Sequence, residues 1–153
     1  MQRGQDAAGI VIIDKDNRVL LVRHTYGKKQ WSIPGGMVND GESAWDAARR
    51  ELKEEINITV SDMELSGLYF QPHKNRYIYV FRARTLEGRP EADQQEIDRY
   101  GFFSLDELPG PISSFTVGRL SDAVHQPKTV YRNEELATYI VYNQENQKGR
   151  NGS

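Results

Sequence analysis

The chain has 153 residues, of which 37% are hydrophobic and 27% charged, so we expect a single globular domain with its own core. Its 20 basic and 22 acidic residues give a net charge of -2, which argues against a general affinity for nucleic acid but leaves room for a local basic patch. The absence of cysteine excludes disulfides and thiolate metal sites.

The first nine residues are polar and lack the apolar core of a secretory signal. No apolar run approaches the ~20 residues that a membrane-spanning helix needs. We therefore expect a cytoplasmic protein for which a membrane is not a partner.

Two apolar runs open the chain, Ala8–Ile13 and Arg18–Val22, with turn-forming residues at 14–17 between them. This pattern predicts a β-hairpin. The next segment, Trp31–Gly36, contains a proline and two adjacent glycines, which argues against regular structure there. From Ser43 to about Ile56 the apolar residues recur at the helical period, so we predict a helix.

The second half of the chain predicts strands near 63–71, 76–85 and 96–103, and the strongest strand signal is the density of β-branched and aromatic residues at 76–81. A helical turn is expected at 104–109, where a proline ends it, and a second helix within 116–125. The order strands, helix, strands, helix predicts a mixed α/β layered fold.

The domain organisation follows from the same pattern. We expect one domain over residues 1–126 and a C-terminal extension over 127–153. The extension is polar, and we expect it to be disordered from about residue 143.

The predicted helix carries three carboxylates close together. At ~100° per residue, Glu51, Glu54 and Glu55 occupy one arc of about 100°. Like charges at these spacings repel one another, and the helix C-terminus is also unfavourable to anions. A set of ligands made of oxygen alone indicates Mg²⁺ or Mn²⁺ rather than Zn²⁺. The alternative is an acidic helix face that is simply solvated.

The spacing of the whole segment is more specific than the carboxylates alone. Its fixed positions are Gly36, Glu42, Arg50-Glu51-Leu52, Glu54-Glu55 and Ile58. The segment resembles the Nudix box at every specified position except one, where the family has glycine and this chain has Asn57. Trp31–Gly36 looks like the usual lead-in to that box, and Phe102–Pro109 resembles a later part of the same domain. The likeness covers roughly residues 7 to 125.

The resemblance implies a fold and a reaction. The fold is an α/β/α sandwich with a mixed β-sheet, in which the box forms loop, helix and loop. The reaction is the Mg²⁺-dependent attack of water on phosphorus in the diphosphate linkage of a nucleoside diphosphate derivative or a nucleoside triphosphate. The expected partner is a small nucleotide substrate, no nucleic acid is expected, and the formation of a homodimer is left open.

The resemblance also assigns roles to the box residues. Glu51, Glu54 and Glu55 would hold Mg²⁺, with Mn²⁺ as a substitute, and Glu51 and Glu54 would act in catalysis. Arg50 would be a further catalytic residue that orients Glu42 or Glu51. The alternative for Arg50 is an ordinary solvated helix charge.

Three further positions complete the expected site. Glu96 is the candidate for a catalytic base outside the box, the alternative being an ordinary carboxylate at a strand edge. Gly35 and Gly36 would shape the loop that approaches the substrate. Arg23 belongs to a basic cluster before the box and would bind phosphate, unless it is a solvated surface charge.

The departure at Asn57 has a physical interpretation. The position follows the predicted end of the helix, where a left-handed residue closes the last turn. Glycine suits that conformation best and asparagine is the next most tolerant residue, so we expect catalysis to be unaffected.

Two other functions remain open. One is removal of pyrophosphate from the 5′ end of RNA, which would call for a basic track that a net charge of -2 does not favour. The other is a non-catalytic nucleotide-binding module with a Nudix-like fold. Such modules usually lose box glutamates, whereas all of them are present here.

Overall fold

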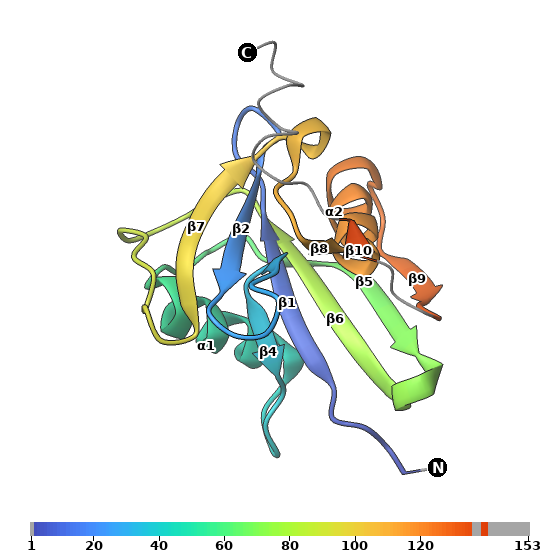
Figure 1. Cartoon of the computed structure of the whole chain (residues 1–153). Coiled ribbons are helices and arrows are strands. Elements are labelled where there is room, and N and C mark those ends of the chain that lie inside the picture. The colour runs from blue at the N-terminus through green and yellow to red at the C-terminus, as the bar shows by residue number, and fades with distance from the viewer. Residues whose placement is uncertain (1, 136–138, 141–153) are drawn as a thin grey trace.

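The computed structural model describes residues 2–135 and 139–140, which form two mixed sheets and two α-helices (Figure 1). The first sheet has the order β4 (Gly35–Met37), β1 (Ala7–Ile12), β6 (Arg76–Ala83), β5 (Glu64–Gln71), β9 (Val130–Asn133). The second has the order β10 (Tyr139–Ile140), β8 (Ile112–Ser113), β3 (Trp31–Ser32), β2 (Val19–His24), β7 (Ile97–Phe103). The helices are α1 (Ala44–Ile56) and α2 (Ser114–His125), and short 3₁₀ turns cover Pro72–Lys74 and Leu105–Glu107. The predicted α/β layered fold is confirmed.

Strand β1 separates two hydrophobic clusters because both of its faces are buried. Ile10 and Ile12 pack in the cluster beneath α1, whereas Val11 and Ile13 pack in the cluster that includes Leu120 of α2. Alternation along a strand sends successive side chains to opposite faces, which explains this division. The sheet that contains β1 therefore lies between the two helices, with α1 and α2 on opposite sides of it (Figure 1).

The ends of α1 follow the sequence prediction. The Ser43 hydroxyl accepts the N–H of Asp46 at 3.0 Å, as an N-cap should. At the other end Asn57 adopts φ 62° and ψ 35°, and its N–H donates to the carbonyl of Lys53 at 3.0 Å. The helix and its left-handed closing residue are thus confirmed.

The predicted hairpin between the first two runs is wrong. The turn itself forms, since the N–H of Asp14 donates to the carbonyl of Arg18 at 2.9 Å. However, β1 and β2 belong to different sheets, and one isolated bridge, Ile13 to Val19, is the pairing recorded between them in the described chain. Turn residues fix the reversal of the chain but not the partners of each strand, and both strands find other partners.

The prediction of irregular structure at 31–36 is also wrong in part. Trp31 and Ser32 form β3, and Gly35 and Gly36 begin β4, which pairs antiparallel with β1. A Cβ on Gly35 would lie 2.4 Å from the carbonyl oxygen of Ala8. Glycine here permits a close approach of two strands rather than breaking one.

The second helix and the segment after it complete the fold. Helix α2 begins at Ser114, two residues before the expected range, with Ser113 as its N-cap. Beyond residue 126, β9 pairs parallel with β5, so the chain continues as part of the first sheet. The disorder expected from about residue 143 concerns residues outside those described. In the described part of the chain, no helix is both long and apolar enough to cross a membrane.

Candidate active site

The C-terminal half of α1 sets a buried carboxylate against the glycine pair of β4. Glu55 is only 2% exposed, and its Oε1 accepts the N–H of Gly35 at 2.8 Å. Among the described residues, the hydrogen bond recorded for this carboxylate comes from a backbone N–H rather than from a cation. A buried carboxylate with such a neutral partner is expensive to ionise.

The second glycine makes room for the second carboxylate. A Cβ on Gly36 would lie 2.6 Å from the Oε1 of Glu51, so a side chain at this position would displace the Glu51 carboxylate. Gly36 therefore forms a cradle for the Glu51 carboxylate, which is largely shielded from solvent. The two glycines predicted to shape the site lie directly against Glu55 and Glu51.

Arg50 gathers three carboxylates around one guanidinium. Its Nε donates to Glu42 at 2.8 Å, and one terminal nitrogen donates to Glu51 at 2.9 Å and to Glu54 at 3.2 Å. The other terminal nitrogen donates to the carbonyl of Met37 at 3.0 Å. The positions of the three glutamates on the helix predicted only repulsion between their charges when no metal is bound. That prediction is wrong, because the Arg50 guanidinium attracts Glu51 and Glu54.

The electrostatics of the cluster differ between its buried and solvated members. The pKa of Glu55 is raised to about 8, chiefly by burial and also by the charges of Glu51, Glu96 and Asp93, against the lowering effect of the Gly35 N–H. Burial also raises the pKa of Glu51, opposed by its hydrogen bond with Arg50. The pKa of Glu42 is lowered, chiefly by its hydrogen bond with Arg50.

The site has the composition that a hard divalent cation requires, although its carboxylates do not converge as they stand. Over the described residues, no three side chains of the metal-ligating types are grouped closely enough to hold an ion. Glu51 and Glu54 are engaged by Arg50, whereas Glu55 is bonded to the N–H of Gly35. The donors are all carboxylate oxygens, and Gly36 leaves the space that the Glu51 carboxylate occupies. This donor chemistry fits Mg²⁺ or Mn²⁺.

Glu96 lies directly before β7, at the end of an ordered loop. The Oδ1 of Asp93 accepts the N–H groups of residues 95, 96 and 97 at 2.9 to 3.1 Å, which fixes the backbone around Glu96. Its side chain is exposed, and its charge contributes to the raised pKa of both Glu51 and Glu55. The structure thus brings Glu96 within electrostatic reach of the box carboxylates.

Arg23 is held by a partner that the sequence did not indicate. Its Nε and one terminal nitrogen donate to the two carboxylate oxygens of Asp98 at 2.9 and 2.7 Å. This fork uses two of the five N–H donors of a guanidinium. Asp98 lies on β7, the neighbour of β2, so only the sheet pairing reveals the contact.

Tyr26 is a further residue at this site that sequence reasoning did not assign. Burial raises the pKa of its phenol, and the charges of Glu96, Glu55 and Glu51 raise it further. The ring lies 5.0 Å from the ring of His24, centroid to centroid, in the loop that follows β2. In the sequence, the indication for Tyr26 is its position shortly before the box. That position does not distinguish it from other exposed aromatic residues.

Comparison with known proteins shows which family the chain resembles in sequence and fold. The family model of the NUDIX domain matches residues 3–144. Among curated proteins, the RNA pyrophosphohydrolase of Histophilus somni (strain 2336) is 39% identical over 82 residues, which cover 54% of this chain and 41% of that protein. The chain therefore spans about two fifths of the length of this relative.

Two other relatives extend the comparison. The oxidized purine nucleoside triphosphate hydrolase of Danio rerio is 33% identical over 106 residues, covering 65% of this chain and 67% of that protein. The crystal structure of a MutT NUDIX hydrolase from Burkholderia pseudomallei superposes with a TM-score of 0.71 at 26% identity, covering 79% of this chain and 98% of that one.

Proposed function

The chain belongs to the NUDIX family, and from this premise we propose that it hydrolyses the diphosphate linkage of a nucleotide derivative with the help of a divalent cation. The observation that carries the proposal is the pair of shielded carboxylates, Glu51 and Glu55, set against Gly36 and Gly35. Such a pair is costly to maintain in a fold unless a cation uses it.

The cation would be held by Glu51, Glu54 and Glu55, and Mg²⁺ is the ion that their oxygens favour, with Mn²⁺ as a substitute. When bound, such an ion neutralises phosphate charge and lowers the pKa of a water ligand. Arg50 would keep Glu51 and Glu54 in place, since it already contacts both. Loading the site would require Glu55 to lose a proton, because its pKa is raised to about 8 in the fold.

Residues outside α1 would complete the chemistry. Glu96 is exposed and electrostatically coupled to the box, so it is suited to accept a proton from the attacking water. The remaining N–H donors of Arg23 would bind a substrate phosphate while Asp98 keeps the guanidinium oriented. Gly35 and Gly36 would hold the loop close to α1.

For the substrate we propose a small nucleotide, a nucleoside triphosphate or a nucleoside diphosphate joined to another group. The Danio rerio relative, named for nucleoside triphosphates, supports this class. The Histophilus somni relative is named for RNA, which makes the 5′ end of RNA the second candidate. The two candidate substrates differ in length, since one is a small nucleotide and the other is the end of an RNA strand. Competition by an unlabelled oligonucleotide for the substrate site would therefore distinguish them.

The test is a phosphate-release screen over nucleoside triphosphates, nucleotide sugars, dinucleoside polyphosphates, ADP-ribose and 5′-triphosphorylated RNA. Each substrate is assayed with Mg²⁺, with Mn²⁺ and with excess chelator. We expect hydrolysis of at least one nucleotide that needs a divalent cation, and products from ¹⁸O-labelled water that carry the label on phosphate. Full activity in chelator, or label on a sugar carbon, would overturn the proposal. Tight nucleotide binding without turnover would instead indicate a binding module.

A further inference from the structure

The loop that leads into β7 carries an aspartate, Asp93, that the proposed hydrolysis does not use. Asp93 is half-buried, and its N–H donates to the carbonyl of Glu55 at 3.0 Å. Two residues earlier, the N–H of Glu91 donates to the carbonyl of Ile56 at 2.9 Å. The last carbonyls of a helix need partners from outside it, and this loop supplies them at the end of α1. The loop is thereby attached to a residue that would hold the cation.

The side chain of Asp93 holds the turn that contains Glu96. Its Oδ1 accepts the consecutive N–H groups of Gln95, Glu96 and Ile97 at 2.9 to 3.1 Å. In the same turn Gln94 adopts φ 66°, and its N–H donates to the carbonyl of Ile97 at 2.8 Å. A glutamine in this left-handed conformation is strained, so the turn persists only because other contacts hold it. The Asp93 carboxylate supplies three of those contacts.

The other side of Glu96 is attached to the loop that follows β2. The N–H of Thr25 donates to the carbonyl of Glu96 at 2.9 Å, and the Thr25 hydroxyl donates to the carbonyl of Gln95 at 2.6 Å. Thr25 lies two residues after Arg23, which is proposed to bind phosphate. Both backbone groups of Glu96 therefore have partners, Asp93 for the N–H and Thr25 for the carbonyl. The backbone of Glu96 is fixed between the end of α1 and the proposed phosphate site.

The Glu96 side chain depends on this fixed backbone. The side chain is exposed and has three rotatable bonds, so packing does little to fix its carboxylate. A general base must lie within about 2.6–3.2 Å of the group whose proton it takes. A displacement of about 1 Å at a reacting group can cost about 100-fold in rate. The position of the Glu96 backbone is therefore the main control over where its carboxylate can reach.

From these contacts we infer that Asp93 is a positioning residue, which holds the backbone of Glu96 so that its carboxylate reaches the cation site on α1. The inference rests on the proposed role of Glu96 as the base. Asp93 touches neither substrate nor cation in this role, and it acts through the three N–H groups that it accepts. Two other roles are outcomes of the test: an effect of its charge, which contributes to the raised pKa of Glu55, and stabilisation of the fold alone.

Two variants of Asp93 separate its hydrogen bonds from its charge. Asp93→Asn removes the charge but keeps an oxygen that can accept the three N–H groups, whereas Asp93→Ala removes both. At saturating Mg²⁺, we expect Asp93→Ala to lower kcat about tenfold or more while KM changes less than about twofold. Asp93→Asn should keep kcat within about threefold of the wild type, because the hydrogen bonds remain. Equal loss of kcat in the two variants would assign the effect to charge and overturn the inference.

A double-mutant cycle tests whether Asp93 acts through Glu96. Glu96→Gln alone should lower kcat about 100-fold or more, as expected for loss of a general base. In that background, Asp93→Ala should lower kcat by less than about twofold further, because the group that it positions is already lost. A further fall of about tenfold would mean that Asp93 acts by another route and would contradict the inference. An unchanged kcat in Glu96→Gln would contradict it as well.

Amide hydrogen exchange provides a measurement that does not depend on activity. In excess chelator, the N–H groups of residues 95–97 should be protected in the wild type and in Asp93→Asn. In Asp93→Ala, we expect them to exchange about tenfold faster or more, because their acceptor is removed. Protection that survives in Asp93→Ala would show that the turn is held without the carboxylate, and the inference would fail.

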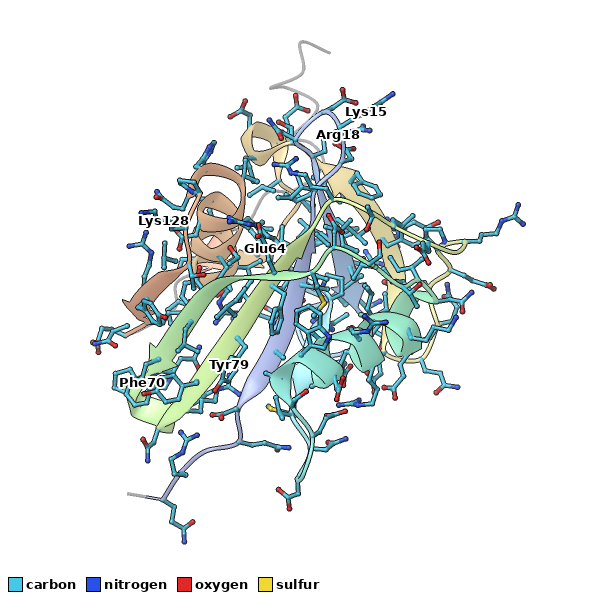
Figure 2. The ribbon with its side chains drawn as sticks, turned by 180° about the vertical axis from the view of Figure 1, so that it is seen from behind. Lys15, Arg18, Glu64, Phe70, Tyr79 and Lys128 are labelled. Carbon is cyan, nitrogen blue, oxygen red and sulfur yellow. The ribbon has the colours of Figure 1, made fainter. Side chains whose placement is uncertain are left out.

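The matched control is Asp14, which holds a similar turn elsewhere. Its Oδ1 accepts the N–H groups of Asp16 and Arg18, both at 2.9 Å, and the turn also contains a left-handed residue, Asn17, at φ 60°. Figure 2 shows this turn, marked by Lys15 and Arg18, at the end of the molecule away from α1. Asp14→Ala should keep kcat within about twofold of the wild type. A loss as large as that in Asp93→Ala would mean that any turn-holding aspartate has this effect, against the inference.

Failure of this inference and failure of the proposed hydrolysis give different results. A wild type that hydrolyses no nucleotide in the phosphate-release screen would overturn the proposed hydrolysis, and the role of Asp93 with it. A wild type that hydrolyses a nucleotide in a cation-dependent way, with kcat unchanged in Asp93→Ala, would overturn the inference alone.

Discussion

Two networks of shielded charge lie within the described residues, and they are balanced in different ways. Between α2 and β9, each buried carboxylate has a guanidinium of its own: Arg132 forks onto Asp122, and Arg119 forks onto Glu134. On α1, one guanidinium serves several carboxylates, and Glu55 is paired with a backbone N–H.

This difference indicates what each network is for. In the α2–β9 network, neutral groups also satisfy the carboxylates, because the Tyr69 hydroxyl donates to Asp122 at 2.8 Å and the Gln71 amide donates to Glu134 at 3.1 Å. Such a network is complete without any ligand and serves to hold β9 on the fold. The α1 network carries an excess of negative charge, which a cation from solution can neutralise.

The largest expected effect comes from breaking the balanced network. Glu134→Ala leaves Arg119 shielded from solvent without its partner, so we expect the free energy of unfolding to fall by about 3–5 kcal/mol. Urea denaturation with the two-state slope checked for each variant measures this. Turnover per folded molecule should stay unchanged, because the network lies outside the carboxylate site.

The neighbouring residue provides the control for this experiment. Glu135 is also a glutamate but is exposed, and Glu135→Ala should change the free energy of unfolding by less than about 0.5 kcal/mol. If Glu134→Ala proves as mild as Glu135→Ala, the Arg119 pair does not hold β9 and the contrast between the two networks disappears.

The next effect concerns the unbalanced network. Glu54 is exposed and joins Arg50 at 3.2 Å, so Glu54→Gln should cost the fold only about 0.3–0.5 kcal/mol. The same change should reduce kcat by about 100-fold or more, about 2.7 kcal/mol in the barrier, since phosphoryl transfer depends on where the cation is held. Steady-state assays at saturating Mg²⁺ measure it.

A matched variant outside the site tests whether kcat falls when any exposed, arginine-paired glutamate loses its charge, or only when Glu54 does. Glu64 is likewise exposed and paired with an arginine, Arg82, at 2.6 Å. Glu64→Gln should leave kcat within about twofold of the wild type. Equal turnover in both variants would mean that the cation site does not include Glu54.

The elements that could be predicted from the sequence are those whose cause is local. The N-cap at Ser43, the helix over 44–56 and the left-handed Asn57 depend on neighbours within a few residues, and the structure has them where expected. The strand over 76–83 also follows from local composition, which is dense in β-branched and aromatic residues.

Features that depend on distant parts of the chain could not be predicted in this way. The separation of β1 and β2 into two sheets depends on pairing with β6 and β7, far along the chain. Strand β9 has mostly exposed residues and is held by pairing with β5 and by arginine forks, so its short sequence gives no strand signal. At the site, the spacing of the box gave the carboxylates, but the contact of Arg23 with Asp98 appears only once β2 and β7 are neighbours.

A pH dependence follows from Glu55. Its pKa is raised to about 8 in the fold, chiefly by burial, whereas an unfolded chain would have the ordinary value of 4.5. A raised native pKa means that the native state binds the extra proton, so this stability is present below pH 4.5 and is lost as the pH rises toward 8. In chelator, we expect the wild type to lose about 2 kcal/mol from this group between pH 5 and pH 6.5.

The variant Glu55→Gln isolates this contribution. Glutamine keeps the shape and can still accept the Gly35 N–H, but it does not ionise. His24, whose pKa is lowered by burial, acts in the opposite direction over the same range, so the relevant quantity is the difference between wild type and variant at each pH. That difference should move in favour of the variant as the pH rises, measured by urea denaturation. A constant difference would show that Glu55 ionises normally.

The smallest effect tests the one position at which the box departs from the family pattern. Asn57 is exposed and sits at φ 62°, a conformation that costs a residue with a Cβ more than it costs glycine. Asn57→Gly should therefore leave turnover intact and change the free energy of unfolding by only some tenths of a kcal/mol, because relief of strain is offset by greater freedom of the unfolded chain.

Asn75 provides the matched control: it has a similar conformation, φ 49°, but its amide donates to the carbonyl of Gln2 at 3.0 Å. Asn75→Gly loses that bond and should be the more destabilising of the two by about 0.5–1 kcal/mol. If Asn57→Gly instead costs more than about 1 kcal/mol, the asparagine side chain makes a specific bond at the end of α1, and its difference from glycine is a requirement of this fold rather than a tolerated exchange.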